Sequence, residues 1–189
     1  MTGIVSRPLL YALDRPILAM KTRSDLMKRL EELGIPVTTV DHPAVFTVSE
    51  SVETDRIIPG GHTKNLFLKD AKGKLWLVVA HAHTEVDLKA LSRRAGAGRF
   101  SFGRADLLQE VLGVSPGSVT VFALINDHDG LVSVVVDEAL MAFDTVNGHP
   151  LENVATTNIA RDDLLRFIRA CGHEPRILYL GRDAAGEPG

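Results

Sequence analysis

The stretch HTKNLFLKDAKGKLWLVVAH, residues 62–81, decides the expected fold. It contains two largely apolar segments, Asn65–Lys69 and Leu75–His81, whose residues are typical of β-strands. The four residues between them, Asp70–Gly73, place a glycine where a tight turn needs one. Residues 62–81 therefore predict an antiparallel hairpin.

Helical and extended segments lie on both sides of this hairpin without a strict strand–helix–strand repeat. Helical spacing of apolar residues, with capping residues or glycines at the ends, predicts helices at Thr22–Leu33, Leu88–Ala95, Ala105–Leu112 and Arg161–Ala170, and a short one from the capping-box pair Thr47 and Glu50 to near Pro59. Further strands are expected at Val37–Val40, from Phe143, and at Ile177–Leu180, with a second hairpin of Val119–Ile125 and Leu131–Val136 and a turn at Asn147-Gly148. This pattern predicts the α+β class, as a single domain with a mixed β-sheet and surrounding helices.

Length and composition limit the possible classes of protein. The 189 residues correspond to about one domain, with 1–20 as an N-terminal arm, 21–181 as the folded domain and 182–189 as a frayed tail. A hydrophobic fraction of 45% excludes a mainly disordered chain. The 21 basic and 24 acidic residues give a net charge of −3, which argues against binding nucleic acid through bulk charge. A small, specific contact with RNA stays possible.

The chain has one cysteine, Cys171, so an intramolecular disulfide and a multi-cysteine zinc site are excluded. Cys171 follows a predicted helix C-terminus, where the helix dipole disfavours a thiolate, and we interpret it as a buried apolar residue. No apolar run approaches the roughly 18 residues of a membrane helix, and the N-terminus does not resemble a signal peptide. We expect a cytoplasmic protein that does not bind membranes.

Two local patterns could bind ligands, and each has a plainer interpretation. The glycine-rich loop Pro59–His62 precedes a strand rather than a helix, which argues against a phosphate-binding loop but leaves a loop that faces substrate. His81 and His83 would lie on one face of a strand, as half of a metal site or as a strand end that leads to a helix cap at Asp87. Because no other histidine-rich cluster completes a ligand set, we expect no metal and no other cofactor.

Positive charge is concentrated in two places. The segment Leu88–Ala105 contains five basic residues and no acidic one, and forms either a solvated surface or a patch that contacts phosphates. Lys64 stands between a flexible loop and an apolar strand, where an ammonium can hold a phosphate or a developing oxyanion. The local pattern alone favours an ordinary surface lysine at this position.

Four segments, taken together, favour a functional role for Lys64 over that of an ordinary surface lysine. They are LGIPVTTVDHPAVFTVSES (Leu33–Ser51), TKNLFLKD (Thr63–Asp70), PGSVTVFALIND (Pro116–Asp127) and HPLENVATTNIARDDLLRF (His149–Phe167). In this order and spacing, the chain resembles the YbaK/prolyl-tRNA editing family, and is most similar to its free-standing alanyl-tRNA(Pro) deacylase branch. The resemblance covers roughly Leu26–Leu180, and it implies a mixed α+β fold with a central cleft and the hydrolysis of misacylated tRNA.

The resemblance also implies the site residues. The lysine of the family's K-N-L-F-L segment matches Lys64, and the glycine and histidine before P-L-x-N match Gly148 and His149, so these three are the implied catalytic residues. The implied substrate-binding residues are Asn65, Gly117, Val121 and His62, and Arg93, Arg94 and Arg99 become candidates for binding tRNA. Val121 stands where the family segment G-x-x-x-P usually has proline, which puts the shape of this pocket wall in doubt.

An aminoacyl ester is already activated, so its hydrolysis needs a positioned water and a stabilised oxyanion rather than a covalent nucleophile or a metal. The implied function is a trans-editing hydrolase that deacylates Ala-tRNA(Pro) and selects alanine over proline by size. The alternatives are a deacylase for cysteine or serine on tRNA, and a non-catalytic module that binds aminoacyl-tRNA or an amino acid. The expected partners are the acceptor end of tRNA(Pro) and, as a further candidate, prolyl-tRNA synthetase, with the chain as a monomer or weak homodimer.

Overall fold

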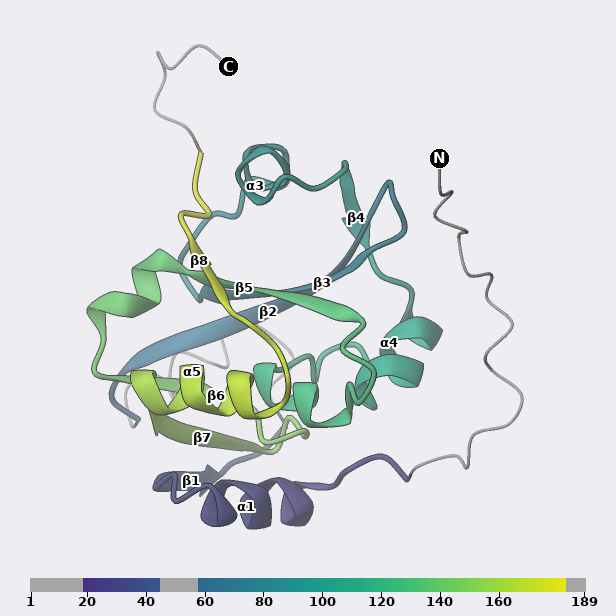
Figure 1. The fold of residues 1–189 in the computed structure, drawn as a ribbon. Helices are drawn as coiled ribbons and strands as arrows, with labels where there is room; N and C mark the ends of the chain where they lie inside the picture. Colours follow the sequence, from purple (N-terminus) through teal and green to yellow (C-terminus); the bar gives the residue numbers. More distant parts are fainter. Residues whose placement is uncertain (1–18, 45–57, 183–189) are drawn as a thin grey trace, which may run out of the picture.

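The computed structural model describes residues 19–44 and 58–182. A mixed sheet of eight strands runs through this part of the chain, in the order β1–β7–β6–β2–β3–β5–β8, and β4 pairs with β2 outside that path (Figure 1). The strands are β1 (Val37–Asp41), β2 (Gly61–Asp70), β3 (Leu75–His81), β4 (Phe100–Phe102), β5 (Val132–Asp137), β6 (Thr145–Gly148), β7 (Ala155–Ala160) and β8 (Arg176–Leu178). The predicted α+β fold, a single domain with a mixed sheet, is confirmed.

Helices pack on both sides of the central strands. Within the described ranges they are α1 (Arg23–Glu32), α3 (Leu88–Ala95), α4 (Ala105–Leu112) and α5 (Arg161–Ala170), with 3₁₀ helices η1 (Val121–Asn126) and η2 (Glu138–Ala142). These four α-helices confirm the four predicted from apolar spacing. Thr22 caps α1 through a capping box with Asp25, as the sequence indicates. The helix predicted from Thr47 and Glu50 lies outside the described residues, as do residues 1–18 of the predicted arm and 183–189 of the predicted tail.

The first hairpin is confirmed, and β2 is longer than predicted because it begins at Gly61. Antiparallel pairing continues from Thr63↔His81 to Lys69↔Leu75. At the turn, the Asp70 carboxylate accepts hydrogen bonds from the backbone N–H of Lys72 at 2.9 Å and of Lys74 at 3.0 Å. The aspartate that predicts the turn therefore also closes it.

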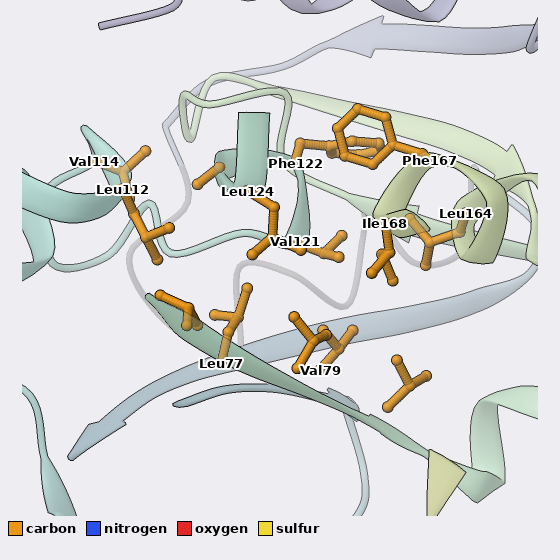
Figure 2. Close-up of a cluster of buried hydrophobic side chains, with 14 of the residues drawn as sticks. Leu77, Val79, Leu112, Val114, Val121, Phe122, Leu124, Leu164, Phe167 and Ile168 are labelled. Carbon is orange, nitrogen blue, oxygen red and sulfur yellow. The ribbon is translucent and has the colours of Figure 1, made fainter. Parts of the chain in front are cut away.

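β3 is buried on both faces from Leu75 to Ala80, and so are Phe67 and Leu68 of β2. Phe67, Leu77 and Val79 belong to a large core cluster with residues of α1, α4, α5 and η1, part of which Figure 2 shows. The alternate residues Leu68, Trp76 and Val78 belong to a second, smaller cluster under α3. This alternation follows from the two-residue period of a β-strand. The hairpin therefore forms the wall between two apolar cores.

The predicted second hairpin is wrong. Val121–Asn126 forms the 3₁₀ helix η1, which Thr120 caps by accepting a hydrogen bond from Phe122 N–H. β5 pairs instead in parallel with β3, from Leu75↔Val132 to Val79↔Val136. A short apolar run does not distinguish a strand from a buried helical turn, and five of the six residues of η1 are buried.

The predicted turn at Asn147-Gly148 is also wrong, because these residues end β6 and pair with Asn158 and Thr157 of β7. The neighbouring strand begins at Thr145 rather than at Phe143, and the last strand ends at Leu178 rather than at Leu180. An Asn-Gly pair signals a hairpin turn when alternating apolar residues flank it on both sides, whereas here His149-Pro150 follows. Here the Asn147 side chain finds partners inside the fold.

Candidate active site

β2 changes its partner along one edge. On this edge β6 pairs in parallel with Gly61 and His62, whereas β4 pairs antiparallel with Leu68–Asp70. In the described ranges no strand pairs with residues 63–67 on this edge. We call this interval the open edge of β2, and it contains Lys64.

Lys64 lies on a polar face of the sheet. Because side chains alternate along a strand, Lys64 and His62 share one face of β2, and the pair His62↔Asn147 extends that face onto β6. This pairing ends at His62↔Asn147, and Lys64 and His149 each lie two residues beyond it, with His149 directly after the last residue of β6. Two of the residues expected in catalysis therefore follow the same end of the paired stretch.

The Lys64 side chain is half-buried, and its ammonium has no hydrogen-bond or ion-pair partner in the described part of the chain. A half-buried ammonium without a carboxylate partner costs desolvation energy that a bound anion would recover. Lys64 therefore has the chemistry of a site for a phosphate or an oxyanion, rather than that of a surface lysine in a salt bridge.

The glycine-rich loop before β2 is packed tightly against β6. A Cβ on Gly60, which has a φ of +110°, would lie 2.6 Å from the carbonyl oxygen of Thr145. The Asn147 amide donates to Pro59 O at 3.1 Å and accepts from Asn158 Nδ2 at 2.7 Å. Close packing therefore explains these glycines, and the loop sets where β2 and Lys64 begin.

His62 helps to hold the same loop. Its Nε2 lies 2.9 Å from the carbonyl oxygen of Ile58, and a carbonyl can only accept, so Nε2 carries the proton. The Asn147 amide nitrogen, 3.1 Å from the same atom, is then a neighbour rather than a donor. His62 lies beside Lys64 on the polar face, and its described contact is structural.

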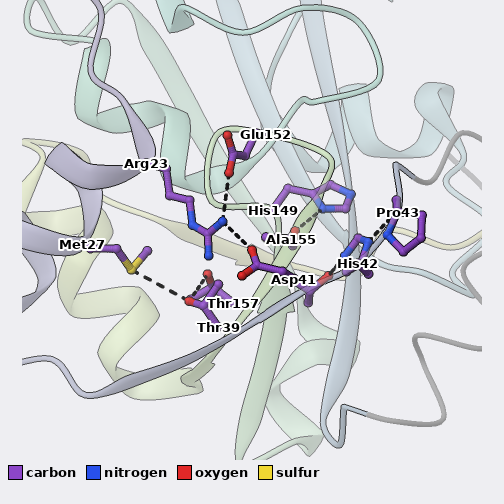
Figure 3. Close-up of polar contacts among 11 residues, drawn as sticks. Arg23, Met27, Thr39, Asp41, His42, Pro43, His149, Glu152, Ala155 and Thr157 are labelled. Atoms are coloured by element: carbon purple, nitrogen blue, oxygen red, sulfur yellow. Dashed lines mark hydrogen bonds and ion pairs between the residues drawn. The ribbon is translucent and has the colours of Figure 1, made fainter.

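His149 offers a base to that face. Its Nδ1 lies 3.0 Å from the carbonyl oxygen of Ala155, so Nδ1 carries the proton and Nε2 has the lone pair (Figure 3). Burial lowers the pKa of His149; the hydrogen bond to Ala155 opposes this shift, and the nearby His42 adds to it. His149 is therefore held in the neutral form that can accept a proton.

Sequence reasoning missed His42, whose ring centre lies 6.3 Å from that of His149. His42 Nδ1 donates to Pro43 O at 2.8 Å, and its Nε2 contacts the Thr156 hydroxyl at 2.9 Å. Arg23 bridges the same region, because it binds Asp41 at 2.6 Å and Glu152 at 3.0 Å (Figure 3). The only signal in the sequence was the place of His42 inside a family-like segment.

Asn65 and Gly148 face the large core instead. A Cβ on Gly148 would lie 3.2 Å from a ring carbon of Phe122, so glycine lets the end of β6 approach η1. The side-chain oxygen of Asn65 is buried and has no hydrogen-bond partner in the described ranges. An unmet buried acceptor costs about 1–3 kcal/mol, so it suits a donor that arrives with the substrate.

Two expected pocket residues lie away from the polar face. Val121 is buried in the large core cluster, near Val79 (Figure 2). Gly117 occupies an exposed turn with a φ of +92°. Both can influence the site through the segment that ends at Phe122, which packs against Gly148.

The basic segment divides into structural and exposed members. Arg94 donates to the carbonyl oxygens of Tyr179 at 3.0 Å and Gly181 at 2.9 Å, and its guanidinium stacks on the Tyr179 ring. Arg94 thus holds the C-terminal segment against α3. Arg93 and Arg99 are exposed and are better placed to contact a nucleic acid.

A cavity of about 430 Å³ lies between α1, η1 and α5, and Lys64 and His149 do not line it. Cys171 does, and burial raises its pKa to about 11. The thiol is therefore protonated at neutral pH and is not a nucleophile. This cavity lacks the reactive groups of the polar face, so we place the candidate site at the open edge of β2.

His81 and His83 contact each other edge to edge at 5.4 Å, and His81 stacks on Phe143 at 5.1 Å. In the part of the chain that the structure describes, no group of three or more His, Cys, Asp or Glu side chains is placed to hold a metal ion. None of the helices in that part is both long enough and apolar enough to cross a bilayer.

Comparisons with known proteins point to one family. The model of the aminoacyl-tRNA editing domain matches residues 42–167. The chain is 36% identical to the prolyl-tRNA editing protein ProX of Acetoanaerobium sticklandii, covering 85% of this chain and 99% of ProX. It is 41% identical to the prolyl-tRNA synthetase associated domain-containing protein 1 of Danio rerio, covering 82% and 87% of the two chains.

A solved structure shows the same fold. The crystal structure of a candidate trans-editing enzyme for prolyl-tRNA synthetase superposes with a TM-score of 0.66 at 18% identity, covering 87% of this chain and all 100% of the other. At this identity the likeness concerns the fold alone. The matched range of the family model includes His42, Lys64 and His149.

Proposed function

The chain belongs to the family of aminoacyl-tRNA editing domains, and from this premise we propose that it is a trans-editing hydrolase that removes alanine from mischarged tRNA(Pro). The observation that carries the proposal is the ammonium of Lys64 at the open edge of β2, which has no partner among the described residues. Lys64 shares its face with His62 and Asn147, and both Lys64 and His149 lie two residues beyond the end of the β2–β6 pairing. The names of the curated relatives, which include prolyl-tRNA editing, support the choice of tRNA(Pro).

Lys64 would act on charge. The substrate carries a phosphate next to the terminal ribose, and the attack of water on the ester carbonyl creates an oxyanion. An ammonium that is already positioned and poorly hydrated stabilises either charge more strongly than it would in bulk water. Lys64 therefore binds the 3′-terminal phosphate or the oxyanion, and needs no partner of its own.

His149 would act on the water. Its Nε2 lone pair accepts a proton from a water molecule as the oxygen attacks the ester carbon. The bond between that carbon and the ribose oxygen then breaks, and the proton passes to the ribose oxygen. The products are free alanine and a tRNA with a free 3′ end. The hydrogen bond to Ala155 keeps the imidazole oriented throughout.

Asn65 and Gly148 face the large core, on the other side of the open edge from Lys64, and would recognise an amino acid that reaches across this edge. The unpartnered side-chain oxygen of Asn65 can accept a hydrogen bond from the α-ammonium group of alanine. Gly148 and Phe122 bring β6 and η1 close together, which limits the space for a side chain. A rigid pocket of this kind accepts a methyl group and excludes a proline ring by overlap.

A deacylation assay tests the proposal with one tRNA(Pro) that carries alanine, serine, cysteine or proline. The value of kcat/KM should be highest for alanine and should fall to background for proline. Higher values for cysteine or serine would assign the same chemistry to another small amino acid. Cleavage of the proline ester as fast as the alanine ester would contradict selection by size, and the absence of any hydrolysis would contradict the proposed function.

A further inference from the structure

Phe102 is an aromatic residue in an unusual position. Its side chain is 68% exposed, which is the highest value among the large apolar residues in the described part of the chain. A single exposed apolar residue needs no explanation by itself. Phe102, however, belongs to β4, the strand that borders the open edge of β2.

The strand register places Phe102 on the same face as Lys64. Phe102 pairs with Leu68, and Lys64 lies four positions before Leu68 on β2, so all three side chains point to one side of the sheet. Four residues along a strand and one strand spacing across it amount to about 14 Å between the backbones of Lys64 and Phe102. Phe102 therefore lies beside the site, but beyond the reach of the group that carries the ester.

β4 holds this ring rigidly. Phe100 is buried and packs edge-on against Trp76, with ring centres 5.5 Å apart. The N–H of Gly103 donates to Phe67 O at 2.8 Å, which fixes the other end of β4 to β2. Because the residues on either side are anchored, the Phe102 ring loses little conformational entropy when a ligand stacks on it.

Exposed basic and polar residues lie next to Phe102 along the chain. Arg99 directly precedes β4 and is exposed, and Ser101, on the opposite face of β4, is exposed between the two phenylalanines. Arg104 follows closely, but its guanidinium pairs with Asp106. No acidic residue occurs between Leu88 and Ala105. An exposed aromatic ring in a segment of basic residues matches a chain of bases and phosphates better than the apolar surface of a protein.

We propose that Phe102 is a stacking platform for a base of the single-stranded 3′ end of the tRNA, upstream of the nucleotide whose ester lies at Lys64, and that Arg99 contacts the adjoining phosphate. The inference rests on the proposed function, because it assumes that the ester lies at the open edge. Stacking on an aromatic ring is tolerant of base identity, so this contact adds affinity rather than sequence selection.

Three variants test the platform. Phe102→Ala removes the ring and Phe102→Trp keeps an aromatic face. Leu131→Ala is a matched control, since Leu131 is a 52% exposed apolar residue next to β5, which pairs with neither β2 nor β4. The probes are a short single-stranded RNA that ends in CCA, alanyl-tRNA(Pro), and alanyl-adenosine, which has no upstream bases.

Phe102→Ala should raise the Kd for the RNA and the KM for alanyl-tRNA(Pro) by roughly 5- to 150-fold, the range for stacking of one base. Its kinetics on alanyl-adenosine should match wild type. Phe102→Trp should restore the affinity, and its indole fluorescence should be quenched as RNA is added, against the background of buried Trp76. Leu131→Ala should behave as wild type.

Equal RNA affinity and equal tRNA KM in wild type and Phe102→Ala would overturn the inference, and so would an equal loss on alanyl-adenosine. If light scattering shows that Phe102→Ala abolishes a dimer while RNA affinity is unchanged, the ring is a protein contact and the inference is again wrong. A wild-type chain that hydrolyses none of the esters would defeat the proposed function, whereas the RNA titration would still decide the role of Phe102.

Discussion

One face of the sheet carries two different sets of side chains. Over β3 and β5, this face presents Trp76, Val78 and Val135, which α3 covers as an apolar cluster. Over β6 and β7, the same face presents Asn147, Asn158 and Thr156. The change occurs within β2, where Leu68 is fully buried and Lys64, four residues earlier, is half-buried and unpaired.

The apolar half of this face, over β3 and β5, stabilises the fold, whereas the polar half, over β6 and β7, offers groups that can take part in chemistry. Burial of an apolar side chain stabilises the fold by about 1.5–3 kcal/mol, whereas a buried polar group at best balances its lost hydration. Most side chains of the polar half do find partners, as Asn147 does with Pro59 and Asn158. Among the described residues of this face Lys64 is the exception, and we therefore attribute its unpaired charge to function.

The largest expected effect comes from placing charge in the apolar half. Leu68→Lys would bury an ammonium in an apolar cluster, where the nearby Asp70 carboxylate already accepts from Trp76 and from backbone N–H groups, and should destabilise the fold by roughly 4 kcal/mol or more. Equilibrium denaturation by urea measures this change. Leu131→Lys, at an exposed position, should change the free energy of unfolding by less than about 0.5 kcal/mol. Equal stability of the two variants would remove the distinction between the halves.

Gly60 should be the most sensitive glycine at the site. Gly60→Ala combines an unfavourable φ of +110° with a clash against the Thr145 backbone, and we expect a loss of about 2–4 kcal/mol together with reduced activity. Gly130→Ala is the control, because Gly130 also has a positive φ, of +63°, but open space around it. It should cost about 1 kcal/mol and leave deacylation unchanged. Similar unfolding curves for both variants would show that close packing of the loop is unimportant.

The pH dependence should report His149. Burial lowers the pKa of His149, so its pKa in the folded state lies below that in the unfolded state. Neutral His149 therefore contributes stability that is fully present above the unfolded pKa and is lost as the pH falls through the folded pKa. Activity should fall on the same acid limb, because protonated Nε2 cannot accept a proton from water.

His42→Gln removes the neighbouring charge that lowers the pKa of His149, so the acid limb of kcat should move to higher pH. His128→Gln, at an exposed histidine outside this face, serves as the control and should leave the limb in place. A profile that is identical in wild type and His42→Gln would show that the two imidazoles are not coupled.

Sequence patterns predict the local elements of this molecule better than they predict which strands pair with each other. The first hairpin and α1, α3, α4 and α5 depend on nearby residues, and they could be found from spacing and caps. The parallel pairs β2–β6 and β3–β5 join distant segments, and their register leaves no local signal. For this reason Asn147-Gly148 was mistaken for a turn, and η1 for a strand.

The site shows the same limit. The family resemblance makes Lys64, Gly148 and His149 candidates, and the structure adds where each lies relative to the open edge of β2. The position of His42 depends on the pairing of β1 with β7, more than 100 residues later in the chain, so its contact with Thr156 could not be predicted. Likewise, nothing near Arg94 in the sequence shows that it binds the C-terminal segment.

The smallest expected effect concerns Cys171. Because burial raises its pKa to about 11, the thiol should react slowly with iodoacetamide at pH 7.5, and Cys171→Ala should retain wild-type kcat/KM with a modest loss of stability. Mass spectrometry of the alkylated protein, alongside the deacylation assay, measures both. Rapid inactivation of wild type that is absent in a folded Cys171→Ala would show that the thiol takes part in the reaction.

The variant Lys64→Leu tests most directly whether the apolar half of this face serves stability and the polar half serves the reaction. Both unfolding and deacylation are measured. This variant extends the apolar surface of β2 by one residue and removes the unpaired ammonium. We predict a free energy of unfolding equal to or greater than that of wild type, and a kcat/KM for Ala-tRNA(Pro) at least about 100-fold lower, as for loss of an oxyanion-stabilising group. A folded Lys64→Leu enzyme with wild-type kcat/KM would contradict the account.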